Sequence, residues 1–450
     1  MRTLIVSDLH LGSAAGVDVL GRPEVRARLL EALRDVDRLV LLGDVLELRH
    51  GPRREALAAA RPFFEDLGRV FGDREVVVLA GNHDHALIEP WLERRSEERA
   101  APEALRVEER FAPQVASPML AQLEAWAAPA RVTVAYPGLW VRPDVYATHG
   151  HYLDCHLTVP TLERLGIGAM GRVLRRPARA FTGPEDYEAV TNPVFAWIDA
   201  IARQAPTGDA LNGGLTVRAW RALRGVEDTA GAAVDGGAGD SIAAPANSVD
   251  GVAAANGAVG ANGVAATNGA DGARRAAYRR AAGALTRTAR RRALAGGFPM
   301  VVAALNRAGL GPFNADLSSG ELRRAGLRAM GEVAARLGLG DAYVVFGHTH
   351  RAGPLPGDDL AEWQIPGGAR LVNSGCWSYD AYFLTANPGE SPYWPGCAVL
   401  VEDDGPPRLL RLLAEHSHAQ LAPGAGEDAW AYTPEHRSQL ARAREDPAQG

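Results

Sequence analysis

Five short polar motifs contain the residues of this chain that could do chemistry. Each follows directly after an apolar run: Ser7-Asp8-Leu9-His10, Gly43-Asp44, Gly81-Asn82-His83-Asp84, Thr148-His149-Gly150 and Gly347-His348-Thr349-His350. Together they supply carboxylates, one carboxamide and several imidazoles, but no thiolate. This mixture of oxygen and imidazole groups suits Mn²⁺, Fe or Zn²⁺ in a reactive site better than a closed structural zinc site.

Such a set of groups points to chemistry at phosphorus. Two divalent ions ~3.5 to 4 Å apart, sharing a carboxylate, are a common arrangement for displacement at a phosphate ester. Paired ions polarise the phosphoryl oxygens and lower the pKa of a shared water towards ~7, which makes hydroxide available at neutral pH. Each motif alone also fits an ordinary loop or turn. The metal interpretation therefore depends on all five motifs occurring together at the ends of apolar runs.

The N-terminal segments predict a parallel sheet that brings the first three motifs together. Residues 3–6, 38–42 and 75–80 are short apolar runs typical of strands buried on both faces. Between them, residues 25–33 and 55–70 carry apolar side chains at helical spacing. This alternation is the βαβ pattern of a parallel sheet, whose carboxyl strand ends are where α/β folds bind ligands.

The later segments extend this pattern around the last two motifs. Residues 131–136, 140–141 and 145–148 predict strands separated by turn signals, which suggests an antiparallel addition to the sheet. A helix is predicted from a cap at Ser318 or Ser319 to Gly338 or Gly340. It leads into a strand at 342–346, which ends at Gly347. Three further strand-like runs follow at 371–372, 398–401 and 409–413.

The middle of the chain has a different character. Helices are predicted at 187–205 and 216–223, and residues 225–272 are rich in Ala, Gly, Asn and Asp, which predicts a disordered linker. The arginine-rich segment between Arg274 and Leu305 is interpreted as a solvated helix. The alternative is a weak contact with an anionic membrane surface.

Composition narrows the class of protein. The 450 residues carry a formal net charge of -6, which argues against a protein built to bind nucleic acid. Three scattered cysteines exclude a disulfide framework and are expected to be reduced thiols. A strand is predicted within a few residues of Met1, and no stretch approaches the ~20 apolar residues of a membrane span, so we expect a cytoplasmic protein without a signal peptide.

The five motifs, in this order, resemble the calcineurin-like metallophosphoesterase superfamily. The resemblance covers roughly residues 1–150 and 341–413 and implies a four-layer α/β/β/α sandwich with a binuclear metal centre. It implies that Asp8, His10 and His350 hold the first metal, that Asn82, His149 and His348 hold the second, and that Asp44 bridges them. His83 is implied as general acid or transition-state stabiliser, oriented by Asp84.

The resemblance also predicts the activity. It implies a metal-dependent phosphoesterase that hydrolyses a phosphomonoester or phosphodiester with two divalent ions, Mn²⁺ in the first place, with Fe or Zn²⁺ as alternatives. Asp8-Leu9-His10-Leu11 and Gly43-Asp44-x-x-Glu47 are similar to the UDP-2,3-diacylglucosamine hydrolases, so a pyrophosphatase acting on a nucleotide-linked lipid or sugar is one alternative. That branch usually carries Arg at the place of His83 and Asp at the place of His151. A non-catalytic scaffold is the other alternative.

The resulting domain organisation is a split phosphoesterase domain. Residues 1–150 and 341–415 form its two halves, residues 151–340 are a mostly helical insertion with the linker, and residues 416–450 are a flexible tail. Several residues near the motifs are weaker candidates for contacts with substrate or with the ligand imidazoles: His85, His151, Asp154, His156 and Arg351. Asn373 is interpreted as a turn residue.

Overall fold

The computed structural model describes residues 1–49, 51–97, 104–204, 302–314, 316, 318–366, 368–381, 383–385, 387 and 390–423. The described residues of 1–214 and 306–450 form one compact unit, and all of the polar motifs lie in it. The predicted helix at 216–223, the predicted linker at 225–272 and most of the segment between Arg274 and Leu305 lie outside the described residues.

The larger of two β-sheets has seven strands in the order β11-β10-β1-β2-β3-β5-β4. Its strands in chain order are β1 (Thr3–Val6), β2 (Arg38–Leu42), β3 (Glu75–Leu79), β4 (Glu109–Phe111), β5 (Arg131–Tyr136), β10 (Cys397–Val401) and β11 (Arg408–Arg411). Strands β1, β2, β3 and β5 are parallel neighbours, whereas β4, β10 and β11 pair antiparallel. The predicted parallel core is confirmed.

The second sheet has four strands in the order β6-β7-β8-β9. These strands are β6 (Gly138–Arg142), β7 (Val145–Thr148), β8 (Tyr343–Phe346) and β9 (Arg370–Asn373). Strands β6 and β7 form an antiparallel hairpin, and β7, β8 and β9 are parallel. The antiparallel addition predicted for 131–148 is therefore correct for the hairpin but wrong for β5. Strand β5 pairs parallel with β3 because the helices between them form a crossover.

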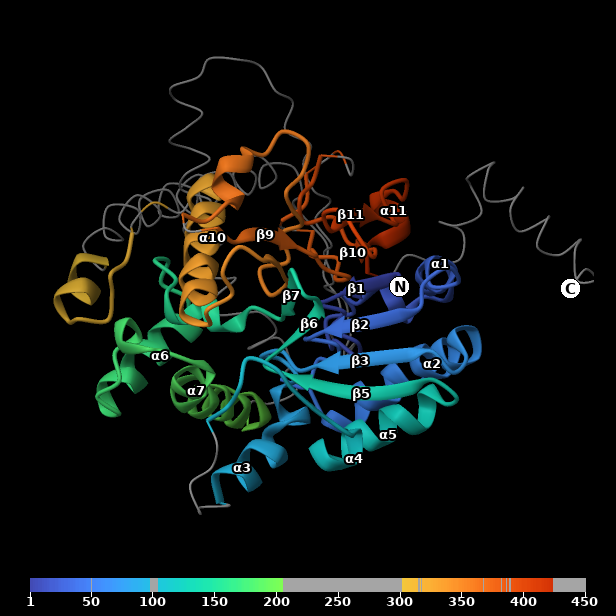
Figure 1. Cartoon of the computed structure of the whole chain (residues 1–450), viewed down its shortest axis with the longest axis horizontal. Coiled ribbons are helices and arrows are strands. Elements are labelled where there is room, and N and C mark those ends of the chain that lie inside the picture. The colour runs from blue at the N-terminus through green and yellow to red at the C-terminus, as the bar shows by residue number, and fades with distance from the viewer. Residues whose placement is uncertain are drawn as a thin grey trace, which may run out of the picture. The chain divides into compact units, whose positions relative to one another are not determined.

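The helices cover the outer faces of the two sheets (Figure 1). In chain order the α-helices are α1 (Pro23–Ala32), α2 (Arg53–Phe71), α3 (Glu89–Glu97), α4 (Pro113–Ala116), α5 (Pro118–Ala127), α6 (Leu162–Val173), α7 (Pro184–Gln204), α10 (Ser319–Arg336) and α11 (His418–Leu421). Short 3₁₀ helices are η1 (Val19–Gly21), η2 (His85–Leu87), η3 (His151–Cys155), η4 (Ala178–Ala180) and η5 (Leu360–Trp363). Helix α10 begins as predicted, because the Ser318 hydroxyl accepts a hydrogen bond from the Glu321 amide.

Three apolar cores make the layers of a four-layer sandwich. One core packs α1, α2 and α5 on the outer face of the seven-stranded sheet, and another packs α10 and η3 on the outer face of the four-stranded sheet. The third joins the facing sides of both sheets, with Val40 and Val77 from one and Ala147 and Val345 from the other. Each fully buried Val or Leu contributes roughly 1.5 to 3 kcal/mol relative to exposure, so the strands form a rigid base for their carboxyl ends. The α/β/β/α prediction is confirmed.

The end of the described chain differs from the predicted flexible tail. The segment predicted as a tail at 416–450 includes α11, whose Leu421 is buried, while residues 424–450 lie outside the described residues. Within the part of the chain that the structure describes, no helix has the length and apolar character needed to cross a bilayer.

Candidate metal centre

All seven predicted metal ligands lie at the carboxyl ends of parallel strands. Asp8 and His10 follow β1, Asp44 follows β2, and Asn82 follows β3. From the second sheet, His149 follows β7, and His348 and His350 follow β8. Because β1, β2 and β3 are in parallel register, with Val6 paired to Leu41 and Leu42 to Leu79, these chain segments leave the sheet side by side.

Backbone hydrogen bonds continue beyond the strands and fix the polar segments to one another. The Asp8 amide donates to the Gly43 carbonyl over 3.1 Å, and the His10 amide donates to the Asp44 carbonyl over 2.9 Å. In the second sheet the Gly347 amide donates to the His149 carbonyl over 2.9 Å. The side chains are thus presented by a hydrogen-bonded backbone and not by independent loops.

Backbone strain is concentrated at the same positions. Among the described residues, six non-glycine residues have a positive φ, and five of them are predicted ligands: Asp8 (55°), His10 (46°), Asp44 (50°), His348 (66°) and His350 (59°). L-residues rarely adopt this left-handed region, and such strain gathers where a function requires a particular side-chain direction. The sixth residue, Arg175, lies elsewhere in the fold.

Two motif glycines leave room for these side chains. A Cβ at Gly81 would lie 2.7 Å from Nε2 of His149 and closer still to the Asp44 carboxylate. A Cβ at Gly347 would collide with the Asp8 carboxylate and with Ser7. Both glycines are therefore required by close packing around the polar cluster, which is one physical reason for their place in the motifs.

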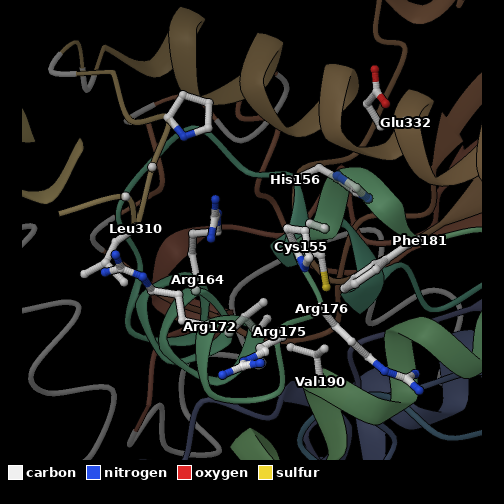
Figure 2. Close-up of a pocket in the computed structure, with 18 of the residues that line it drawn as sticks. Cys155, His156, Arg164, Arg172, Arg175, Arg176, Phe181, Val190, Leu310 and Glu332 are labelled. Atoms are coloured by element: carbon white, nitrogen blue, oxygen red, sulfur yellow. The ribbon is translucent and has the colours of Figure 1, made fainter. Parts of the chain in front are cut away.

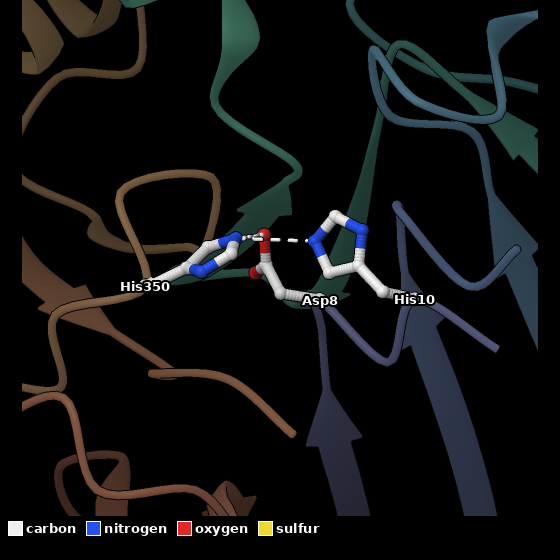
Figure 3. Close-up of side chains that lie close together, drawn as sticks. All are labelled: Asp8, His10 and His350. Atoms are coloured by element: carbon white, nitrogen blue, oxygen red, sulfur yellow. Dashed lines mark hydrogen bonds and ion pairs between the residues drawn. The ribbon is translucent and has the colours of Figure 1, made fainter. Parts of the chain in front are cut away.

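Asp8, His10 and His350 form a first group of potential ligand atoms (Figure 3). Their ligand atoms lie within 4.8 Å of one another. Nε2 of His350 is 3.1 Å from Nε2 of His10 and 3.3 Å from Oδ1 of Asp8. Two ligands bound ~2.1 Å from the same ion lie ~3 to 4.2 Å apart, so these separations fit a shared cation.

Asp44, His149 and His348 form a second group within the same limit of 4.8 Å. Nε2 of His149 lies 3.3 Å from Oδ2 of Asp44. The side-chain oxygen of Asn82 lies 3.1 Å from Nε2 of His149 and 2.9 Å from Nδ1 of His348. Oδ2 of Asp44 is also 3.9 Å from Nε2 of His10, so Asp44 lies between the two groups, where the sequence predicts a bridge.

The hydrogen bonds on the far side of each imidazole determine which nitrogen faces the cluster. Nδ1 of His149 is 3.0 Å from the Leu42 carbonyl, and Nε2 of His348 is 3.1 Å from Asp154. Each of these oxygens requires the N–H of the ring, which leaves a lone pair on Nε2 of His149 and on Nδ1 of His348. Both lone pairs point at the Asn82 amide and, for His149, at Asp44. Without an ion, the Asn82 NH₂ group satisfies both nitrogens when it faces them, whereas binding through the Asn82 oxygen requires a cation between the oxygen and the two imidazoles.

In the first group, too, acceptor atoms of the side chains face one another. Nδ1 of His10 is 3.1 Å from Glu47, so its lone pair on Nε2 faces His350 and Asp44. Oδ1 of Asp8 is buried and makes no hydrogen bond among the described residues, and the His350 imidazole is the possible cation beside it, with Nε2 at 3.3 Å. A buried carboxylate oxygen is costly unless a protonated imidazole or a metal ion satisfies it. The residues present therefore fit the binding of positive ions.

The pKa values of the imidazoles also show that the cluster favours positive charge. Burial disfavours the charged form of His10, but the carboxylates of Glu47 and Asp44 outweigh it and raise the pKa of His10 to about 9. Burial likewise opposes the charge on His149, whose pKa the Asp44 carboxylate raises to about 9. The pKa of Asp44 is held well below its usual range by the surrounding imidazoles, despite its burial. The cluster thus stabilises positive charge strongly.

Residues 1–168 match the sequence model of the calcineurin-like phosphoesterase family. This match supports a place in the metallophosphoesterase superfamily for the N-terminal part of the chain. A search of curated proteins found no match. The family match includes Asp8, His10, Asp44, Asn82 and His149 and ends before the motif with His348 and His350, whose place in the cluster is seen in the structure alone.

The carboxylate that contacts the His83 imidazole is Glu47 and not Asp84, which the sequence predicted. Nδ1 of His83 lies 2.9 Å from the Glu47 carboxylate, and Glu47 also holds His10. The Asp84 carboxylate instead accepts hydrogen bonds from the amides of Gly81, Asp44, Val45 and Leu46. Asp84 therefore orders the backbone of two motifs, and the prediction that it orients the His83 imidazole is corrected.

His83 itself lies at the open side of the cluster. Its side chain keeps 21% exposure, and its ring packs edge-on against His10 with centroids 4.8 Å apart. Its amide donates to Oδ1 of Asp44 over 2.7 Å. Burial lowers the pKa of His83, although Glu47 opposes this effect. A partly exposed imidazole beside the ligands is the geometry required of a group that contacts substrate.

The weaker candidates divide into supporting and unrelated residues. Asp154 holds His348 as described above, and Asn373 is not a simple turn residue. Its side-chain amide donates to the Gly347 carbonyl and to the Thr349 hydroxyl, so it braces the last motif. Arg351 makes a bidentate ion pair with Asp358. The remaining candidates, His85, His151 and His156, contact Glu188, Tyr136 and Tyr187 respectively.

Sequence reasoning did not assign Glu47, Ser7 or Arg49 to the site. Ser7 donates to Oδ2 of Asp8 over 2.5 Å, which fixes the carboxylate. The guanidinium of Arg49 lies 3.3 Å from the Asn82 amide and 3.4 Å from Glu163 of α6. A signal existed for Glu47 alone, since it follows Asp44 at a fixed spacing in the motif. Ser7 opens the first motif but was assigned no role, and Arg49 stands at a position where the sequence carries no comparable pattern.

Proposed function

We propose that this chain is a metal-dependent phosphoesterase that hydrolyses a phosphomonoester or phosphodiester with two divalent ions. The observation that carries the proposal is the convergence of buried imidazole nitrogens and carboxylate oxygens in two groups, in each of which the ligand atoms lie within 4.8 Å of one another. His10 Nε2, His149 Nε2, His348 Nδ1 and Oδ1 of Asp8 all point into this cluster. The family match supports a phosphoesterase in general, and the donor set supports the ions.

The protein's own residues would hold and orient the reacting groups. Asp8, His10 and His350 would bind one ion, and Asn82, His149 and His348 the other, with Asp44 between them. Two such ions supply Lewis-acid polarisation of the phosphoryl oxygens and a hydroxide nucleophile at neutral pH. His83, held by Glu47, would donate a hydrogen bond or a proton to the leaving oxygen. Arg49 adds positive charge beside Asn82, where an anionic substrate would bind.

The finer assignments remain proposals. Mixed carboxylate, amide and imidazole ligands suit Mn²⁺, with Fe and Zn²⁺ as alternatives. Pyrophosphatase action on a nucleotide-linked lipid or sugar stays an alternative that a substrate panel tests directly. The superfamily also has non-catalytic members. No ligand position has been lost here, which favours an enzyme. The weak membrane-surface contact of the segment from Arg274 to Leu305 stays a prediction. The expected cytoplasmic location also stays a prediction.

The experiment combines metal content with hydrolysis of nitrophenyl phosphate and bis-nitrophenyl phosphate. We expect Asp44→Ala to remove both ions and to lower kcat/KM by at least about a thousandfold, because one carboxylate serves both groups. His348→Ala should mainly remove one ion. His83→Ala should keep the metal content and slow turnover by about a hundredfold, the range of general acid catalysis.

Matched controls use the same substitutions away from the cluster. Asp403, whose side chain is 80% exposed, provides Asp403→Ala, and the half-buried His418 of α11, which contacts Tyr379 and Thr385, provides His418→Ala. Both should leave metal content and hydrolysis unchanged. Full hydrolysis by a metal-free Asp44→Ala protein would refute the proposal. Loss of metal in His83→Ala equal to that in His348→Ala would make His83 a ligand.

A further inference from the structure

A cavity of about 610 Å³ lies among the helices that follow the fourth motif, outside the metal cluster (Figure 2). Its walls come from the end of η3, from α6, from the turn after α6, from α7, from residues 309–312 and from α10. Ligand pockets in proteins commonly measure ~300 to 1,000 Å³, so this space is large enough for a small molecule.

The cavity is strongly positive. Arg164, Arg172, Arg175, Arg176 and Arg336 line it, and Glu332 is the one carboxylate in the lining. Figure 2 shows Glu332 on the opposite side from Arg164, Arg172 and Arg175. Glu332 is paired with Arg336. Among the residues with described positions, no carboxylate forms an ion pair with Arg164, Arg172 or Arg175. The pKa of His156 is lowered to about 4 by burial, so this imidazole adds no charge at neutral pH.

Arg164 is the most telling of these cations because it is 6% exposed. Its Nε donates to the Leu157 carbonyl over 3.0 Å, and its guanidinium lies 5.2 Å from the centre of the Phe313 ring. Burial lowers its pKa, although an arginine stays charged. A buried cation without a carboxylate is costly, and an anion in the cavity would offset that cost.

Arg175 is placed in the cavity at the expense of a strained backbone. It is the sixth non-glycine residue with positive φ, at 54°, and the other five are predicted metal ligands. It follows the end of α6, where its amide donates to the Arg172 carbonyl and the next amide donates to Gly171. This is the helix end at which glycine is usual, since an L-side chain is disfavoured there. An arginine at this strained position indicates that its side chain has a function in the cavity.

The rest of the lining is apolar. Ile167, Phe181, Val190 and Leu310 face the same space as the arginines. Beside them, Val173 is 77% exposed and Leu174 is 42% exposed, between Arg172 and Arg175. Figure 2 shows Leu310 beside Arg164 and Arg172, and Phe181 at the other end of the cavity. A cavity that offers both cations and apolar side chains matches a ligand that carries an anionic group on an apolar body.

We propose that this cavity is a second binding site, for the phosphate, phosphonate or carboxylate group of a small molecule with an apolar body. The anion would be bound by Arg164, Arg172 and Arg175, and the apolar body by Phe181 and Val190. The occupant is either a distal part of the phosphoester substrate or a separate effector, because both sources share this chemistry. The site does not depend on the proposed phosphoesterase activity.

Calorimetric titration of octylphosphonate into the full chain tests the site. Its carbon–phosphorus bond resists phosphoester hydrolysis. We expect the Kd to rise at least tenfold in Arg172→Gln/Arg175→Gln, since each loses a charge-assisted hydrogen bond. A double control on α2, Arg61→Gln/Arg69→Gln, makes the same charge change at exposed positions and should leave the Kd unchanged. Octanol and octyltrimethylammonium should bind at least tenfold more weakly than octylphosphonate.

Arg175→Gly separates binding from folding. Glycine relieves the positive φ, so the variant should melt at a higher temperature than the original chain and yet bind octylphosphonate more weakly. Weaker binding by a more stable protein cannot result from misfolding. An unchanged Kd in both Arg175→Gly and the Arg172→Gln/Arg175→Gln chain would overturn the proposal.

The Asp44→Ala chain distinguishes the cavity from the metal centre. Octylphosphonate should bind this chain with an unchanged Kd, even if the phosphoesterase proposal fails. Binding that is lost in Asp44→Ala and kept in the arginine variant would place the ligand at the metal centre and overturn the proposal. In the active protein, octylphosphonate inhibition of nitrophenyl phosphate hydrolysis that depends on the arginines identifies which occupant the cavity binds. Competitive inhibition indicates a substrate site, and a change in kcat alone indicates an effector site.

Discussion

Two buried polar clusters in this protein both combine imidazoles with carboxylates. They differ in how many hydrogen-bond donors face their acceptors. The metal cluster joins Asp8, His10, Asp44, His149 and their neighbours. The second cluster, which we call the tyrosine–glutamate cluster, consists of His85, Tyr136, Tyr152 and Glu188. In it both tyrosine hydroxyls donate to Oε1 of Glu188, and His85 lies 3.3 Å from Oε2. Each acceptor has a donor, so the cluster is satisfied without an ion.

We infer from this comparison that donor balance, more than residue type, separates the candidate metal site from a structural network. The two clusters are interleaved in the sequence, since Asn82 is close to His85 and His149 is close to Tyr152. Both are buried. In the metal cluster the outer nitrogens of His10, His149 and His348 face fixed acceptors, which directs lone pairs inward. The metal cluster therefore favours positive charge, as the raised pKa values of His10 and His149 also indicate.

The largest effect should come from crowding the metal cluster with a single methyl group. In Gly81→Ala the new Cβ would collide with the Asp44 carboxylate and with His149. We expect at least about a thousandfold loss of phosphoesterase activity together with loss of bound metal, because small displacements of catalytic groups are costly. Metal analysis and kinetics measure this. Gly16→Ala is the control, since a Cβ there has open space, although its positive φ makes it mildly strained. Normal metal content in Gly81→Ala would contradict the packing of the cluster.

The tyrosine–glutamate cluster should affect folding and not metal binding. Glu188→Ala leaves two tyrosine hydroxyls and His85 without their acceptor, so we expect a loss of about 3 kcal/mol in the free energy of unfolding. Urea denaturation measures this loss, and metal content should stay the same. Glu31→Ala, at a side chain with 67% exposure, should change stability by less than about 0.5 kcal/mol. If Glu188→Ala released metal, the two clusters would not be separate.

Glu47 should have an intermediate effect, because it acts through two imidazoles. Glu47→Gln removes the charge that holds His10 and His83. We expect a 10- to 100-fold weaker affinity for metal, about the range for residues that orient metal ligands, and slower turnover at saturating metal. Activity measured against metal concentration separates the two effects. Unchanged kcat at saturating metal would remove the proposed role of Glu47 in positioning His83.

The smallest effect is expected at Ser7. Ser7→Ala removes one hydrogen bond to Oδ2 of Asp8, while the amide of His348 still donates to the same oxygen over 3.1 Å. We expect a loss of about 1 kcal/mol, which corresponds to roughly a fivefold weaker affinity for metal. Competition with a fluorescent chelator measures it. A loss as large as that in Gly81→Ala would show that Asp8 depends on Ser7 alone.

Much of the sheet could be predicted from the sequence. Strands β1 and β2 have the predicted bounds, and β3 ends one residue earlier, because a continuous apolar run buried on both faces is a strong signal. The ligand positions followed from the abrupt end of those runs in a parallel sheet. The pairing of β5 did not, because parallel and antiparallel edge strands have similar local patterns.

The supporting contacts could not be predicted in the same way. Glu188 lies within a helix and reaches Tyr136 across 52 positions of the chain, and Asp154 reaches His348 across 194. No local periodicity encodes such pairs. The arginines of the cavity are likewise distributed over α6, the turn that follows it, and α10, and become neighbours only in the folded chain.

The most direct test of the metal cluster is anomalous diffraction from crystals of the full chain grown with Mn²⁺. We predict two anomalous peaks ~3.5 to 4 Å apart. One should lie among Asp8, His10 and His350, the other among Asn82, His149 and His348, with Asp44 between them. The Asp44→Ala chain under the same conditions should show neither peak. Absence of both peaks from the original chain with saturating Mn²⁺, Fe and Zn²⁺ would contradict the account.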